Sequence, residues 1–93
     1  MLTIVAKITA KPDYGADIEQ GLKALIPPTR SEEGCLQYDL HKSCEDPNVF
    51  MFVENWKDKA SFDAHMKSKH LNDFLKNNEY ALADLQIYQL EKI

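Results

Sequence analysis

The sequence predicts a single α+β domain in the ferredoxin-like arrangement, βαββαβ with an antiparallel sheet. Three observations support this prediction. Apolar residues alternate with period two in several short segments, two longer segments carry apolar residues at helical spacing, and proline, glycine and acidic residues lie between them. A chain of 93 residues has room for one core, so one domain is expected over residues 1–93.

The first strand is expected over residues 2–11, where every second side chain is apolar. The segment 12–15, Pro-Asp-Tyr-Gly, favours a turn. Apolar residues between 18 and 29 then recur at helical spacing, which predicts a helix. Pro27 and Pro28 interrupt helical hydrogen bonding, so a kink is expected near Pro27, and Gly34 is the expected left-handed residue before the next strand.

The remaining elements follow from the same periodicities. They are a strand at 35–43, a hairpin turn at 44–48, a strand at 49–57, two helical pieces between 58 and 75 separated at Ser68–Lys69, and a last strand within 82–92. The strand VFMFVENWK is largely apolar on both faces, whereas two helices cover only one face of a four-stranded sheet. A homodimer is therefore expected, in which a second copy covers the other face.

Charge and cysteine usage narrow the class of protein. The net charge is −4, and the 11 Lys and Arg residues are scattered, which argues against a nucleic-acid partner. No apolar run approaches the roughly 20 residues of a membrane span, and the start of the chain lacks the pattern of a signal peptide. Cys35 and Cys44, about 30 Å apart along an extended chain, are not expected to form a disulfide. A cytoplasmic protein is therefore expected.

Four residues are candidates for proton transfer: Tyr38, Glu54, His65 and His70. Candidate substrate-binding residues are Trp56, Phe52, Phe50, His41 and Arg30. Glu54 shares one side of its strand with the aromatic residues, and burial there would raise its pKa into the range of a general acid or base. The alternatives are that Glu54 pairs with a Lys or Arg at the surface and that Trp56 serves only the core.

His65 shares an apolar stripe with Phe62 and Met66, so a neutral imidazole is expected to face inward and to accept a proton from a bound phenol. The alternative is a core histidine bonded to a backbone carbonyl. In a continuous helix His70 would lie about 140° around from His65, so the pair is not expected to bind one metal ion. No flavin, nicotinamide or nucleotide motif is present.

Four segments together resemble the antibiotic biosynthesis monooxygenase domain, in its small quinol-monooxygenase-like branch. They are KPDYGADIEQGLKAL, PPTRSEEGCLQYDL, EDPNVFMFVENWKD and FDAHMKSKHLNDF. The most specific pieces are the EEGC link from Glu32 to Cys35, the pair Glu54 and Trp56, and the run Ala64, His65, Ser68 and His70. The likeness extends over essentially the whole chain.

The resemblance implies a ferredoxin-like fold, a homodimer whose sheets meet as an α/β barrel, and a pocket between sheet and helices. Several relatives oxidise quinols or polyketide phenols with O₂ and without metal, flavin or haem. The expected function is thus a cofactor-independent monooxygenase of a small aromatic substrate, with Tyr38, Glu54, His65 and His70 handling protons or positioning substrate and Trp56 as a pocket wall. Two alternatives remain open: an isomerase or tautomerase of a small dicarbonyl compound, and a noncatalytic dimer that binds a small aromatic ligand.

Overall fold

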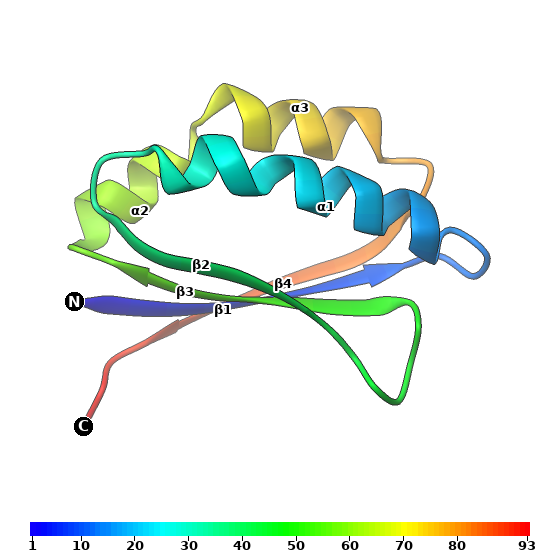
Figure 1. Ribbon diagram of the computed structural model, residues 1–93, viewed down its shortest axis with the longest axis horizontal. Helices are drawn as coiled ribbons and strands as arrows, with labels where there is room; N and C mark the ends of the chain where they lie inside the picture. Colours follow the sequence, from blue (N-terminus) through cyan, green and yellow to red (C-terminus); the bar gives the residue numbers. More distant parts are fainter.

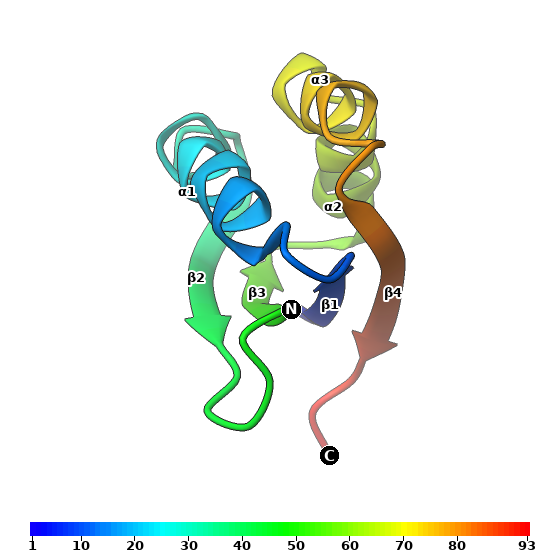
Figure 2. The same cartoon turned by 90° about the vertical axis from the view of Figure 1, so that its right-hand side faces the viewer.

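A computed structural model describes residues 1–93. Its elements are β1 (Leu2–Ala10), α1 (Gly15–Arg30), β2 (Cys35–Lys42), β3 (Val49–Trp56), α2 (Lys59–Met66), α3 (Lys69–Asn77) and β4 (Leu82–Leu90). The strands form one antiparallel sheet in the order β2-β3-β1-β4, and all three helices lie over the same face of it (Figures 1 and 2). The ferredoxin-like prediction is confirmed, with the second helical region divided in two.

The helix α1 places one apolar stripe against the sheet. Its buried residues are Ile18, Leu22, Leu25 and Thr29, spaced at about one turn of a helix. The helix remains one element through Pro27 and Pro28 and ends at Arg30. Gly34 follows with φ of 84°, so the expected left-handed residue before β2 is confirmed.

The helices α2 and α3 are separate because each has its own N-terminal cap. The Asp58 carboxylate accepts a hydrogen bond from the Ser61 N–H at 2.8 Å, and the Ser68 hydroxyl accepts one from the Leu71 N–H at 3.4 Å. Ser68 has extended backbone angles, φ −64° and ψ 148°, so the chain leaves helical geometry between the two helices. The predicted interruption is confirmed, and it determines where the two histidines lie.

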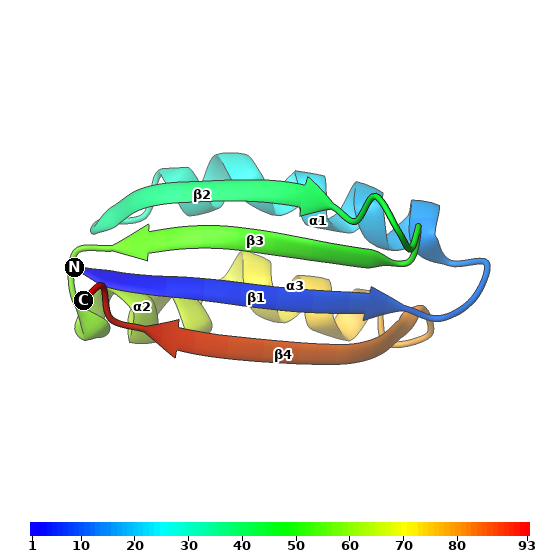
Figure 3. The same ribbon diagram turned by 90° about the horizontal axis from the view of Figure 1, so that it is seen from below.

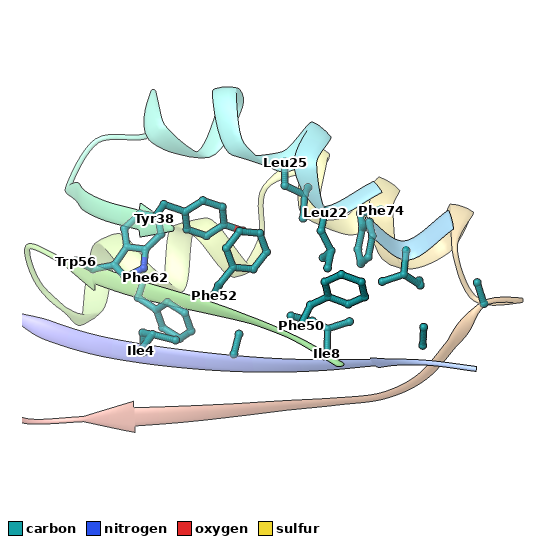
Figure 4. Packing of buried hydrophobic residues seen from close by; sticks show 14 residues of the cluster. Ile4, Ile8, Leu22, Leu25, Tyr38, Phe50, Phe52, Trp56, Phe62 and Phe74 are labelled. Atoms are coloured by element: carbon teal, nitrogen blue, oxygen red, sulfur yellow. The ribbon is translucent and has the colours of Figure 1, made fainter. Parts of the chain in front are cut away.

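One side of the sheet, the helix-facing side, carries the core. Every second residue of β1, from Ile4 to Ala10, is buried there, and so is every second residue of β3, from Phe50 to Trp56. Figure 4 shows the hydrophobic members of this set, such as Ile8 and Phe50, packed beneath Leu22, Leu25 and Phe74 of the helices. The period-two pattern read from the sequence therefore corresponds to real faces of the sheet.

The strand β2 contains one extra residue near its start. Cys35 and Gln37 pair with adjacent residues of β3, so Leu36 has no partner of its own and is 60% exposed. This is a β-bulge. Because of it, Cys35 and Tyr38 lie on the same, helix-facing side of the sheet although they are three residues apart.

The opposite side of the sheet, the open face, is covered by no helix (Figure 3). Met51, Tyr88 and Leu90 expose 38%, 47% and 45% of their surface, and Met51 and Tyr88 belong to this face because they pair with Lys7 and Val5 of β1. Isolated apolar residues on a surface are ordinary, but several of them on a sheet face that no helix covers are typical of an interface. The homodimer stays a prediction.

Cys35 and Cys44 are both free thiols, and Cys44 is exposed. None of the three helices combines the length and the hydropathy that crossing a bilayer requires.

Candidate functional site

A cavity lies between the helix-facing side of the sheet and the helices. Its volume is about 460 Å³ when its opening to solvent is included. Fourteen of the 16 residues that line it are hydrophobic, and the other two are Glu54 and His65. Tyr38 and Phe52 lie next to each other within this layer (Figure 4). An apolar cavity with a few convergent polar groups is the usual form of a small-molecule site.

Glu54 is a buried carboxyl group on β3. Only 3% of its surface is exposed, and its Oε1 accepts a hydrogen bond from the indole Nε1 of Trp56 at 2.9 Å. Burial raises the pKa of Glu54 to about 7, because the charged form loses its hydration. The alternative of a surface pair with Lys or Arg is wrong, and the prediction of a carboxyl group among aromatic residues is confirmed.

His65 lies in the last turn of α2 with 2% of its surface exposed. Its ring stacks against Trp56, with centroids 4.8 Å apart, and meets the edge of Tyr38 at 5.6 Å. Its Nδ1 lies 2.6 Å from Oε2 of Glu32. Because a carboxylate accepts, Nδ1 carries the proton in a neutral ring, and Nε2 is left as the acceptor. Burial lowers the pKa of His65, and the bond to Glu32 opposes that effect.

His70 reaches the same carboxylate oxygen from the first turn of α3. Its Nε2 lies 3.0 Å from Oε2 of Glu32, and the two imidazole centroids are 6.1 Å apart. The expectation that the two histidines point in different directions is wrong, because it assumed a continuous helix and the chain restarts at Ser68. Glu32 itself, in the link between α1 and β2, was not among the predicted site residues.

Tyr38 completes the polar part of the cavity. It lies on β2 with 2% of its surface exposed, and its ring stacks on Phe52 with centroids 4.2 Å apart. Burial raises the pKa of the Tyr38 hydroxyl, and the nearby Glu54 carboxylate raises it further. At neutral pH this group is therefore a neutral phenol that can donate a hydrogen bond.

The five predicted substrate-binding residues divide into three groups. Phe52 lines the cavity, whereas Phe50 and Trp56 are buried in the core beside it. Arg30 is exposed and donates hydrogen bonds to the Tyr38 carbonyl and the Asp39 carboxylate. His41 is exposed and pairs with Met51 on the open face. Arg30 and His41 do not line the cavity.

The fold and the cavity define a small ferredoxin-like domain with a buried acid–imidazole site. The family model for antibiotic biosynthesis monooxygenase matches residues 1–77. The crystal structure of PA3566 from Pseudomonas aeruginosa is 40% identical, superposes with a TM-score of 0.94, and covers 99% of this chain and 93% of that one.

Two curated relatives extend the comparison. A protein of Bacillus subtilis (strain 168) named "Putative monooxygenase YcnE" is 32% identical over 92 residues, which are 98% of this chain and 97% of that protein. The protein sll1783 of Synechocystis sp. is 27% identical over 92 residues, and the match spans 96% of this chain but 63% of sll1783. The chain belongs to the antibiotic biosynthesis monooxygenase family.

Proposed function

We propose that this protein is a monooxygenase that oxidises a small quinol or phenol with O₂ and uses no cofactor. Membership of the monooxygenase family supports the class of reaction. The apolar cavity supports a small aromatic substrate, because its walls are aliphatic and aromatic side chains. The single observation that carries the proposal is the buried His65 ring, whose Nδ1 is held by Glu32 while the ring lines the cavity.

His65 is the general base in this proposal. The bond from Nδ1 to Glu32 fixes the tautomer and the orientation of the ring, so that Nε2 accepts the hydroxyl proton of a bound hydroquinone. Glu32 also stabilises the imidazolium that forms, since its carboxylate lies 2.6 Å away. Burial lowers the pKa of His65, and this keeps its ring neutral before the substrate binds.

The reaction balances with O₂ as the only oxidant. The hydroquinone anion transfers one electron to O₂, and the semiquinone and superoxide radicals combine to form a C–O bond at a ring carbon that carries hydrogen. The peroxide takes a proton from His65. The ring carbon then loses its hydrogen as a proton, the O–O bond breaks, and hydroxide leaves and becomes water. One hydroquinone and one O₂ thus give one hydroxyquinone and one water.

Glu54 and Tyr38 handle the other protons and position the substrate. With a pKa of about 7, Glu54 exists as both acid and carboxylate near neutral pH, so it suits proton delivery to the leaving hydroxide. The Tyr38 hydroxyl, held neutral by its raised pKa, donates a hydrogen bond to a substrate oxygen. Both groups line the cavity together with His65.

A homodimer is part of the proposal. The open face exposes Met51 of β3 and Tyr88 of β4, on either side of β1, and has no helix of its own to cover it. A second copy of the chain, packed sheet to sheet, would remove this surface from water. Light scattering at micromolar concentration tests this directly, and a monomer there would contradict the dimer without affecting the proposed reaction.

The test of the proposed reaction is O₂ consumption by chelator-treated protein with a panel of hydroquinones, corrected for spontaneous autoxidation. Saturable uptake is expected, and His65→Ala should lower it at least about tenfold, the lower end for removal of a general base. Asp63→Ala is the matched control, because Asp63 lies on the exposed side of the same helix.

Two outcomes would contradict the reaction. Uptake that is unchanged in His65→Ala would remove this residue from the mechanism. No uptake above background, combined with His65-dependent exchange of the α-proton of a dicarbonyl compound, would favour the isomerase alternative.

A further inference from the structure

Three potential metal ligands from three different parts of the chain meet beside the cavity. Glu32 comes from the link after α1, His65 from the end of α2 and His70 from the start of α3. Each residue offers one ligand atom, and the three atoms lie within 4.8 Å of one another. The contacts to Oε2 of Glu32 come from Nδ1 of His65 and Nε2 of His70. We propose that these three residues bind one divalent transition-metal ion, with Zn²⁺ as the probe ion.

The donor set suits such an ion. Two imidazole nitrogens and one carboxylate oxygen, with a fourth position left to water, form a common coordination sphere for Zn²⁺. The mixed nitrogen and oxygen donors favour Zn²⁺, Cu²⁺, Ni²⁺ or Fe²⁺ over Ca²⁺ and Mg²⁺, which prefer oxygen alone. The only ion-pair partners of Glu32 are the two histidines, so no Lys or Arg competes with a metal ion for its carboxylate.

The present spacing must change before all three donors can reach one ion. With metal–ligand bonds of about 2.0–2.1 Å, neighbouring donors of a tetrahedral site are about 3.3 Å apart. The two pairs that share Glu32 are now 2.6 Å and 3.0 Å apart, and the two imidazole donors lie within 4.8 Å of each other. An ion that replaces the shared protons would therefore move the carboxylate outward by less than about 1 Å and bring the His70 ring closer to His65. Glu32 and His70 can move because their side chains are partly exposed.

The ion would enter from solvent without opening the core. The side chains of Glu32 and His70 are 17% and 25% exposed, whereas that of His65 is 3% exposed. Glu32 and His70 are absent from the lining of the cavity, whereas His65 belongs to it. His65 is therefore the one residue that the proposed metal site and the cavity share.

A consequence for catalysis rests on the proposed function. An ion on Nδ1 of a neutral imidazole leaves the single ring proton on Nε2, which then donates and no longer accepts. Metal binding would therefore block His65 as a general base. In this way an ion outside the cavity would inhibit the oxidation of a substrate inside it.

The binding test is calorimetric titration of chelator-treated protein with Zn²⁺. One ion per chain is expected, and Glu32→Gln and His70→Gln should each weaken binding at least about tenfold, since even residues that only orient a ligand commonly contribute this much. His41→Gln is the matched control, because His41 is the one remaining histidine and lies exposed on the open face. Far-ultraviolet circular dichroism of each variant without metal confirms that it is folded.

Two results would overturn the metal site: no binding to the folded wild-type protein, or equal affinity in wild type, Glu32→Gln and His70→Gln. The O₂ assay then tests the consequence. Zn²⁺ should inhibit the wild-type protein, and His70→Gln should require at least about tenfold more Zn²⁺. If Zn²⁺ binds without inhibiting, the metal site stands but the inference that the ion blocks His65 is wrong. If no hydroquinone is oxidised at all, the calorimetric titration still tests the metal site.

Discussion

The substitution Glu54→Gln should change how the stability of this protein depends on pH. Glu54 is 3% exposed and makes one side-chain hydrogen bond, to the Trp56 indole at 2.9 Å. Glutamine keeps the shape of the side chain and a carbonyl oxygen that accepts the same bond. The variant therefore removes the titration of the carboxyl group with little change in packing.

The size and sign of the effect follow from the pKa. Burial raises the pKa of Glu54 from 4.5 to about 7, so the folded protein binds this proton more tightly than the unfolded chain does. The resulting stabilisation is complete below pH 4.5 and is lost as the pH rises through 7. At about 1.4 kcal/mol per pH unit, the loss amounts to about 3 kcal/mol in the free energy of unfolding.

The assay is denaturant unfolding of wild type and variant between pH 4 and pH 8, at one protein concentration because a dimer would make stability concentration-dependent. The quantity compared is the difference in unfolding free energy, wild type minus variant, which should fall by about 3 kcal/mol across this range. His65 has a lowered pKa and therefore acts in the opposite direction, but it is present in both proteins and cancels in the difference.

A flat difference, or one that rises with pH, would refute the reasoning that burial dominates the titration of Glu54. The control is Glu33→Gln, which makes the same chemical change at an exposed position outside the core.

Three further predictions concern positioning, backbone and assembly. Glu32→Gln should lower kcat for hydroquinone oxidation at least about tenfold with a smaller change in KM, because Glu32 acts through His65, and a change in KM alone would contradict that role. Gly34→Ala should lower the free energy of unfolding by more than about 1 kcal/mol, since φ is 84° and the added methyl group would meet the Ser61 hydroxyl; chemical denaturation equal to wild type would disprove the strain. Met51→Lys should convert the proposed homodimer to monomer in light scattering, because its charge would lie on the open face, and a dimer that stays intact would place the interface elsewhere.

The elements of the fold could be predicted because they rest on local periodicity. Period two in residues 2–11 and 49–57 corresponds to strands whose alternate residues are buried, and the spacing from Ile18 to Thr29 corresponds to the buried stripe of a helix. The ends of strand β4 were harder to predict, because none of its residues is fully buried. It ends at Leu90, whereas residues up to 92 were expected in the strand.

The site could be predicted only in part. Glu54 and Trp56 lie two residues apart on one strand, so their common side follows from the sequence. The meeting of Glu32 with His65 and His70 depends on two links, and no periodicity describes a link. A useful signal was nevertheless present, because Ser68 is a typical N-cap that places His70 in the first turn of a new helix.

Arg30 and His41 show a second limit of reasoning from residue type. Both are polar residues close in sequence to Tyr38, yet Arg30 bonds to the backbone of β2 and His41 lies on the open face. Tyr38 and His41 are three residues apart, so strict alternation already places them on opposite faces, and residue type alone was a poor guide. The bulge at Leu36 changes the face of Cys35 relative to Tyr38, which strict alternation cannot anticipate.

That bulge also makes the two thiols chemically unequal. By turning Cys35 toward the helices, it places the sulfur in a partly buried environment, where burial and the neighbouring Glu32 and Glu54 carboxylates raise the pKa of the thiol. Few molecules at neutral pH then carry the reactive thiolate at Cys35, whereas Cys44 lies exposed after the end of β2. An alkylating reagent or a fluorescent label would therefore attach first at Cys44, so one extra residue in a strand gives this protein a single preferred handle for chemical labelling.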